Sequence, residues 1–83
     1  SMAMLELTEQ ELARHNGIDG ARAYIAYEGR IYDVTESWLW RRGRHGAAHH
    51  AGTDLTQAMA QAPHGADLLE RCPQVGVLVR APA

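Results

Sequence analysis

The segment that decides the fold reads AYIAYEGRIYDVT and covers residues 23–35. Two runs rich in apolar and β-branched residues, 23–27 and 30–34, flank Glu28-Gly29. A glycine in a two-residue turn supplies the positive φ that a tight hairpin requires. The segment is therefore predicted to form a β-hairpin, with strands over these two runs.

The stretch before the hairpin carries the signals of a helix start. Thr8 and Glu11 have the spacing of a capping box, in which each side chain accepts a hydrogen bond from the other residue's backbone. Leu7 and Leu12 flank this box as a hydrophobic staple does. These patterns predict one short helix over 9–15.

After the hairpin, the sequence predicts short helices and one more strand. Pro63 and Pro73 each end a helical pattern, because proline cannot continue a helix. The resulting order of helix, hairpin, short helices and strand indicates a single α+β domain. The expected elements are a helical turn over 37–40, a loop over 41–46, a helical turn over 47–50, helices over 55–62 and 65–71, and a strand over 75–79. The domain covers 1–83, with a cloning remnant and flexible start over 1–4 and a flexible tail over 80–83.

Length and cysteine usage limit how this domain can be stabilised. A chain of 83 residues supports one domain whose own core leaves a thin margin of stability, so a metal or a cofactor is a reasonable expectation. Cys72 is the only cysteine, which excludes an internal disulfide, a CxxCH haem attachment and a cysteine-rich metal site. A lone cysteine also fits a reducing, cytoplasmic location.

Charge and hydropathy exclude further classes. The net charge of −2 gives no electrostatic case for nucleic acid. No apolar run approaches the roughly 20 residues of a membrane span, and no signal peptide is recognisable. We therefore expect no nucleic-acid partner and no membrane span.

Histidine is the unusual feature of the composition. Of the five histidines, three lie within the six residues 45–50, and His64 follows shortly after. The helices predicted around them contain few large apolar residues, so they cannot close a dry core by themselves. A bound group with histidine ligands would fill that space.

The sequence resembles a known family, the cytochrome b5-like domains. Residues 23–25 and 29–35 resemble the strand pair ending in VYDVT of that family, and residues 51–56 (AGTDLT) resemble its AGxDxT helix start. His64 follows at the distance where the family places its second axial histidine. The resemblance covers about residues 5–79. It implies a small sheet with short helix pairs that form a pocket for non-covalent haem b, and one-electron transfer to a redox partner protein.

The loop that carries the family's first iron ligand is different here. Cytochrome b5 has an HPGG turn about eleven residues before the AG pair, and Trp40 stands at that distance from Ala51. In the membrane-associated progesterone receptor branch a tyrosine of this loop is the ligand, and Ala47 occupies its place. The pattern is more similar to that of small, stand-alone prokaryotic members, described as haem/steroid-binding proteins.

Three histidines are therefore the candidate ligands of the iron. His64 lies between Pro63 and Gly65, at a corner between two helices, and the resemblance makes it the favoured ligand. His45 and His49 compete for the other side of the iron. They lie four residues apart and share a face if residues 47–50 are helical.

The glycines around His45 favour it over His49. Gly43 and Gly46 would let its loop approach a flat macrocycle closely. An iron bound by His64 alone remains an alternative. The pocket wall is expected to include Tyr32, Trp40, Ala47, Leu55, Met59 and Leu68, with Trp38 and Leu39 beside them.

Two other functions compete with electron transfer. Haem storage or sensing, or the binding of another small ligand, needs the pocket without redox work. A zinc site would use His45 and His49, with His50 or His64 as third ligand. No nucleophile–base set and no glycine-rich phosphate loop supports an enzyme, so the chain is expected to be a carrier or a binding module.

Overall fold

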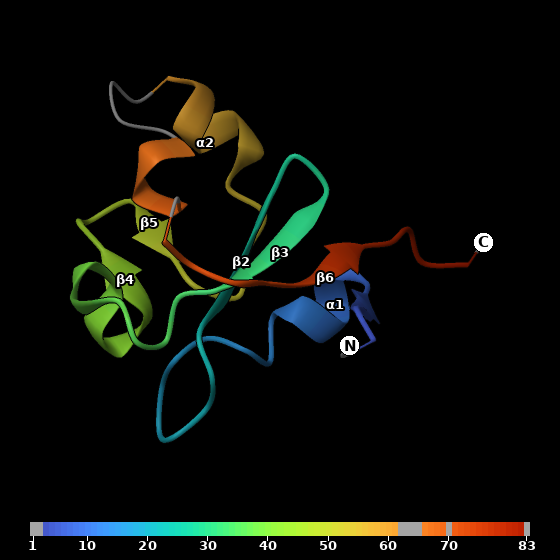
Figure 1. Ribbon diagram of the computed structural model, residues 1–83, viewed down its shortest axis with the longest axis horizontal. Coiled ribbons are helices and arrows are strands. Elements are labelled where there is room, and N and C mark those ends of the chain that lie inside the picture. The colour runs from blue at the N-terminus through green and yellow to red at the C-terminus, as the bar shows by residue number, and fades with distance from the viewer. Residues whose placement is uncertain (1–2, 62–65, 70, 83) are drawn as a thin grey trace.

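The computed structural model describes residues 3–61, 66–69 and 71–82 of the chain. It is an α+β fold in which a small sheet carries short helices and a second hairpin at one end (Figure 1). The elements in chain order are β1 (Leu5–Leu7), α1 (Glu9–Leu12), β2 (Tyr24–Tyr27), β3 (Arg30–Asp33), the 3₁₀ segment η1 (Trp38–Gly43), β4 (Arg44–His45), β5 (His49–His50), α2 (Thr56–Ala60), the 3₁₀ helix η2 (Ala66–Leu69) and β6 (Gln74–Leu78).

The predicted hairpin is confirmed. β2 and β3 pair antiparallel from Tyr24↔Asp33 to Tyr27↔Arg30. Glu28 and Gly29 form the turn with φ of +50° and +80°, the left-handed pair that matches the twist of a two-residue hairpin. The last predicted strand is confirmed within one residue as β6.

The main sheet has the strand order β1-β6-β3-β2. β6 pairs antiparallel with β3 and parallel with β1, so the two ends of the chain lie side by side in the sheet. β1 was not predicted: three residues carry too little pattern, and its partner is about seventy positions away in the sequence. The parallel pair places both termini at the end of the molecule opposite the β4–β5 hairpin (Figure 1).

The capping box is confirmed, but the helix that it starts is shorter than predicted. The Glu11 amide donates to Thr8 Oγ1 at 3.2 Å, and the Thr8 amide donates to Glu11 Oε1 at 3.0 Å. The helix covers Glu9–Leu12 in place of the predicted 9–15. So short a helix gains little from its own hydrogen bonds, and Leu12, which is fully buried, holds it against the sheet.

The helical turn predicted over 47–50 is wrong. Residues 44–50 form a β-hairpin in which Arg44 pairs with His50 and His45 with His49. Gly46 begins its three-residue turn with φ of +70°. A single helical turn of Ala47 and Ala48 would be marginal by itself, whereas the hairpin is attached to the body of the protein at both ends.

The helices before and after this hairpin also differ in extent from the prediction. η1 continues to Gly43, so the expected 41–46 loop begins as 3₁₀ structure, interrupted by non-helical backbone at Trp40, Arg41 and Arg42. α2 lies inside the predicted 55–62 helix and η2 inside the predicted 65–71 helix. Residues 62–65 and 70 lie outside the described part of the chain.

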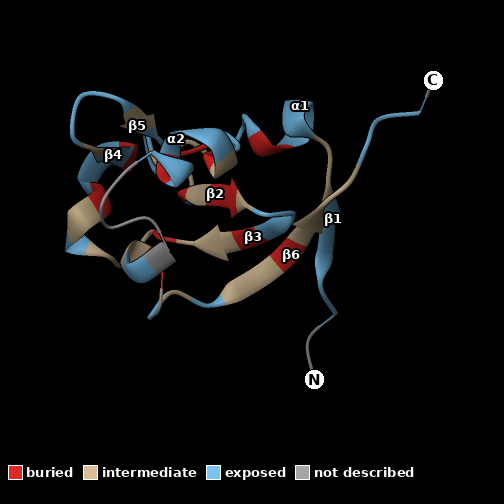
Figure 2. Cartoon of the chain, turned by 90° about the horizontal axis from the view of Figure 1, so that it is seen from above, coloured by how far each residue is buried: buried red, intermediate tan, exposed pale blue. Residues whose placement is uncertain are grey.

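Buried side chains form two clusters. Figure 2 marks the buried positions along the chain in red. The smaller one joins Leu12 to the main sheet through Ala26 and Ile31. The larger one lies where the sheet meets η1, α2 and η2, and it contains Ala23, Ile25, Val34, Trp40, Ala51, Leu55, Met59 and Leu69. Within the described residues, no helix has the length and apolar character to cross a membrane.

Candidate functional site

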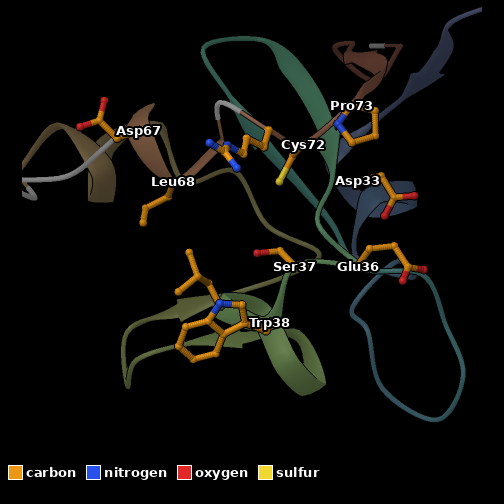
Figure 3. A pocket seen from close by; sticks show the side chains of 10 residues that line it. Asp33, Glu36, Ser37, Trp38, Asp67, Leu68, Cys72 and Pro73 are labelled. Atoms are coloured by element: carbon orange, nitrogen blue, oxygen red, sulfur yellow. The ribbon is translucent and has the colours of Figure 1, made fainter.

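A cleft of about 420 Å³ opens between η1 and η2. Trp38 of η1 lines one side, and Asp67 and Leu68 of η2 line the other (Figure 3). Leu39, also of η1, is a further lining residue. Cys72, which follows η2 in the chain, also lines the cleft (Figure 3). The remaining lining residues are Asp33, Glu36, Ser37, Arg71 and Pro73. A cleft of this size is within the range of small-molecule and cofactor sites.

The β4–β5 hairpin brings two histidines together. His45 and His49 are direct cross-strand partners, so their side chains share one face of the hairpin. The ring centroids are 5.9 Å apart and the ring planes differ by 20°. The sequence predicted this proximity from helical spacing, but strand pairing is what produces it.

His45 is held in one orientation by its neighbours. Its Nδ1 lies 3.1 Å from the carbonyl oxygen of Leu39. A carbonyl can only accept, so this bond places the proton on Nδ1 and leaves the lone pair on Nε2 in the neutral ring. The Trp40 ring packs against the imidazole, with centroids 5.4 Å apart. An imidazole whose other nitrogen bonds a backbone carbonyl is the usual arrangement of a metal-ligating histidine.

Close packing of two glycines sets the position of this hairpin. Gly43 is buried, has φ of +70°, and leaves no room for a Cβ beside the backbone of Asn16. A Cβ on Gly17 would in turn lie 2.9 Å from the Gly43 Cα. The amide of Ala51 donates to the Gly43 carbonyl at 2.7 Å, which joins the two ends of the hairpin, and the amide of Gly52 donates to the Tyr24 carbonyl of β2 at 2.6 Å, which ties this base to the main sheet.

The sequence predicted that Gly43 lets its loop approach a flat ligand, and this packing gives a different reason for glycine at position 43. Its missing side chain serves contact with Asn16, inside the protein, and not the approach of a planar ligand. Gly46 is different, because nothing lies within 4 Å of a Cβ placed there. Of the two glycines, only Gly46 has the open space that the predicted approach of a flat ligand needs.

The other predicted site residues fall into three groups. Leu68 lines the cleft. Leu55, Met59 and Trp40 are buried together in the larger core cluster, which lies behind the cleft wall. Tyr32 faces a separate surface hollow, and Ala47 is exposed on the turn of the β4–β5 hairpin. His64 lies outside the described residues, in the segment between α2 and η2.

Trp40 has one further property. Its indole Nε1 is buried and has no hydrogen-bond partner among the described residues. Such a group loses its hydration without compensation. Within the described residues, the Trp40 side chain therefore contributes packing against His45 and the core and no hydrogen bond.

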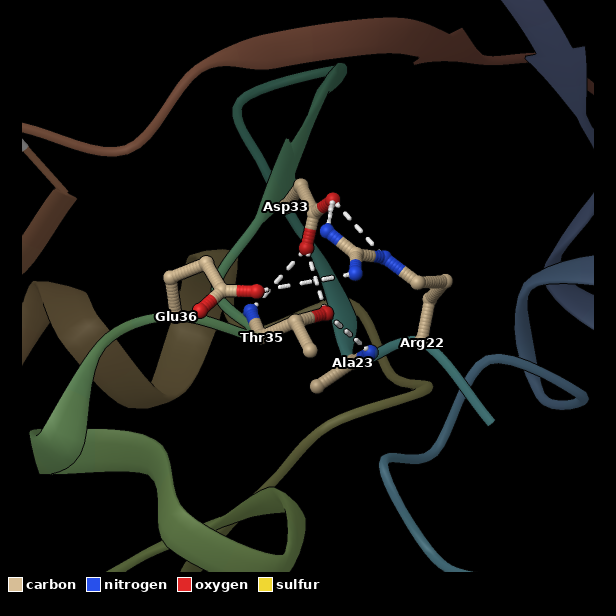
Figure 4. Close-up of polar contacts among 5 residues, drawn as sticks. All are labelled: Arg22, Ala23, Asp33, Thr35 and Glu36. Carbon is tan, nitrogen blue, oxygen red and sulfur yellow. Dashed lines mark hydrogen bonds and ion pairs between the residues drawn. The ribbon is translucent and has the colours of Figure 1, made fainter. Parts of the chain in front are cut away.

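A network of polar side chains surrounds Asp33, one of the residues that line the cleft (Figure 4). Arg22 donates to Asp33 Oδ2 at 2.6 Å from one terminal nitrogen and at 3.2 Å from Nε. The Thr35 amide and hydroxyl donate to Asp33 Oδ1 at 2.9 and 2.5 Å. Arg22 also lies 3.7 Å from the Glu36 carboxylate. Two of the acids that line the cleft therefore share one cation.

These contacts change the titration of two cleft residues. Burial by itself would raise the pKa of Asp33, but the hydrogen bonds from Thr35 and Arg22 outweigh it and hold that pKa below its ordinary value. Burial raises the pKa of the Cys72 thiol, and the negative charge of Asp33 adds to this. The thiol is thus kept protonated, as expected for a small apolar wall residue.

The sequence did not identify the polar lining of the cleft. Ser37, Asp67 and Arg71 have no motif that separates them from other exposed polar residues, and only the tertiary structure brings them to one opening. The zinc hypothesis also lacks a third ligand on the hairpin, because His50 is exposed and pairs with Arg44. Within the described residues, no group of three His, Cys, Asp or Glu side chains is placed to hold a metal ion.

The fold and the site define a class of protein: small α+β domains with a cleft between short helices and a histidine beside it. The family pattern described as Cytochrome b5-like Heme/Steroid binding domain matches residues 8–79. The chain belongs to that family.

Solved structures agree with this assignment. The chain is similar to a cytochrome b5 domain protein of Hadesarchaea YNP_N21, with 53% identity over 92% of this chain and 100% of that chain, at a TM-score of 0.87. A cytochrome b5 domain protein of Methanococcoides burtonii matches with 52% identity over 93% of this chain and 100% of that one, also at 0.87. A hypothetical protein of Arabidopsis thaliana with a cytochrome b5 like fold matches at 0.73 and 21% identity, over 95% and 94% of the two chains, which supports the fold alone. No curated protein matches.

Proposed function

We propose that this domain binds haem b non-covalently in the cleft between η1 and η2 and passes single electrons. The hydrogen bond from His45 Nδ1 to the Leu39 carbonyl carries the proposal. It prepares Nε2 as a neutral nitrogen ligand, and it does so through a residue that itself lines the cleft. Family membership supports haem or steroid binding in general.

Several observations favour His45 over His49 as the ligand from this hairpin. His45 has both a carbonyl partner and a packed aromatic neighbour, Trp40, whereas no such bond to His49 is found among the described residues. The two histidines lie side by side on one hairpin face, so they would reach an iron from the same side. A second histidine would then have to come from elsewhere in the chain, and we propose His64, which the sequence places between α2 and η2.

The apolar part of the cleft fits the faces of a flat ligand, whereas three acids, Asp33, Glu36 and Asp67, occupy other parts of its lining. Trp38, Leu39 and Leu68 offer apolar surface on both walls. Haem also carries two propionate carboxylates, which need a cation or hydrogen-bond donors. Arg22 is already engaged with Asp33 and Glu36, so we assign the propionates to Arg71, the other arginine close to the cleft among the described residues.

The haem would supply a ferric–ferrous couple that takes up and returns one electron at a time. Trp38, Leu39 and Leu68 would hold it and exclude water from its apolar faces, and His45 and His64 would bind the iron. With two histidines bound, the iron would have no coordination position left for a substrate. We therefore propose a cytoplasmic electron carrier that meets a redox partner protein, and not an enzyme.

Spectroscopic titration with haemin tests this function. The purified protein should take up one equivalent and give a low-spin bis-histidine spectrum in both oxidation states. His45→Ala should give a high-spin spectrum and weaken haem binding by more than the roughly 10- to 100-fold that loss of an outer-shell partner costs. His64→Ala should weaken binding similarly.

His50→Ala is the matched control, because His50 is exposed on the same hairpin and faces away from His45. It should leave the spectrum unchanged. If His49→Ala and not His45→Ala changes the spin state, the assignment within the hairpin is wrong. A well-folded wild-type protein that stays colourless with haemin would reject the function, and a high-spin ferrous form that shifts with carbon monoxide would indicate haem sensing or storage.

A further inference from the structure

A positively charged surface lies beside the histidine hairpin. Arg41 and Arg42 of η1 and Arg44 of β4 are all exposed, and Trp38 is 71% exposed. We call these four residues the arginine rim. Three of the eight basic residues of the chain thus lie within four consecutive positions. The rim joins the cleft through Trp38, which lines it, and joins the hairpin through Arg44, which precedes His45.

The rim keeps its charge in the folded protein. The ion pairs found within the described residues both belong to Arg22, and none involves a rim arginine. Asp19 lines a hollow together with Arg42 and Arg44. Of the exposed acids that line the cleft with Trp38, Glu36 is already within 3.7 Å of Arg22, and Asp67 lies on η2. Asp19 alone shares a hollow with the rim arginines, so three guanidinium groups leave the η1–β4 side of the rim positive.

The composition of the rim is that of a contact surface. Arginine and tryptophan are enriched where proteins bind each other, whereas large exposed aromatic side chains are unusual elsewhere. Arg41 lies with its guanidinium carbon 5.8 Å from the centre of the Trp38 ring, so the cation and the aromatic face form one unit. Arg42 has φ of +57°, a conformation in which glycine or asparagine would be less strained. The backbone conformation therefore does not explain why an arginine occupies this position.

Local charge outweighs the net charge at ordinary ionic strength. The protein as a whole carries −2, and it measures 33 × 28 × 25 Å. The Debye length is about 10 Å at 0.1 M salt, roughly a third of these dimensions. A partner that approaches the hairpin end therefore experiences the rim more strongly than the acidic remainder of the surface.

We propose that the arginine rim is the docking surface for a redox partner protein with an acidic patch. This inference rests on the proposed function, since electron transfer is what would bring a partner to this end of the molecule. The contact would be small and transient, with charge that speeds association more than it strengthens binding. A nucleic acid fits less well, because an extended polyanion would also meet the acidic remainder of the surface, and three arginines would neutralise only about three phosphates.

The sign of the salt dependence of electron transfer tests the rim. The reduced haem protein is mixed with hexacyanoferrate(III), an anionic one-electron oxidant, at ionic strengths from about 0.01 M to about 0.3 M. Net charge predicts repulsion and a rate that rises with salt. The rim predicts attraction and a rate that falls several-fold.

Two triple variants with the same change in net charge make the test specific. Arg41→Gln, Arg42→Gln and Arg44→Gln together should reverse the slope, so that the rate rises with salt. Arg14→Gln, Arg30→Gln and Arg80→Gln together remove three exposed arginines outside the rim and should keep the falling rate. Equal effects of the two triples would overturn the proposal, as would a rising rate in the wild type.

A binding measurement separates this inference from the proposed function. A decaglutamate peptide, used as a probe of acidic protein surfaces, should shift the NMR signals of the Trp38 indole and the rim amides, and the rim triple should abolish these shifts. This result is expected whether or not the haem iron is redox-active. No peptide-induced shift, or a stronger response to a short DNA duplex, would overturn the assignment of an acidic protein partner.

Discussion

Replacing Gly43 by alanine should destabilise the domain far more than the same change at Gly46. The two residues have the same φ, +70°, so the backbone cost of an L side chain is equal, about 1–2 kcal/mol at each. They differ only in surroundings. The new methyl group at Gly43 meets the backbone carbonyl of Asn16, whereas at Gly46 it meets open space.

The size of the difference follows from what the methyl group meets. Overpacking in a filled interior costs about 1–3 kcal/mol, and the upper part of this range applies because a backbone carbonyl cannot rotate away. Gly46→Ala should therefore cost about 1 kcal/mol and Gly43→Ala about 4 kcal/mol. In a domain of this size each kcal/mol lowers Tm by about 4–8 °C, so the variants should differ by roughly 12–24 °C.

Thermal unfolding followed by circular dichroism measures both variants under one set of conditions. Haem titration adds a second readout, since displacement of the hairpin should also move His45 and weaken haem binding in Gly43→Ala alone. The reasoning would be refuted if the two variants melted within a few degrees of each other. The contact with Asn16 would then not be what requires glycine at position 43.

Three further outcomes are expected. The pKa of Asp33 is lowered in the folded state, so its contribution to stability is present above the unfolded pKa of about 4 and is lost as the pH falls through the folded pKa. Asp33→Asn should therefore lower the free energy of unfolding at neutral pH and weaken its fall toward acid pH in a series of urea denaturations. An unchanged fall toward acid pH would contradict this. Arg71→Gln should weaken haem binding roughly tenfold but leave the affinity for haem dimethyl ester, which lacks the propionate charges, unaltered; equal losses with both ligands would remove Arg71 from the propionate site. Met59 is 2% exposed, so Met59→Ala should lower the free energy of unfolding by about 2–5 kcal/mol. Urea denaturation measures this change, and a loss below about 1 kcal/mol would contradict the prediction.

The sequence alone determined the elements that depend on local signals. The Glu28-Gly29 turn fixed the central hairpin, because few residues tolerate a positive φ and the strands on either side have the apolar pattern of a half-buried sheet. The capping box started α1 at the expected residue. The family resemblance, carried by residues 29–35 and 51–56, supplied the fold and the haem-binding class, and the match over residues 8–79 confirms that membership.

Tertiary structure decided what local signals could not. β1 exists only because Leu5–Leu7 finds Gly76–Leu78 at the other end of the chain, a pairing too distant for any local pattern to indicate. The 44–50 segment has helix-compatible residues but becomes a hairpin, since Gly43 packs on the backbone of Asn16 at one end and the Gly52 amide bonds the Tyr24 carbonyl at the other. That change turns a helical i, i+4 pair into a cross-strand pair and gives His45 the Leu39 carbonyl as partner. The orientation of an imidazole depends on which backbone group lies beside it, and only the folded chain determines this.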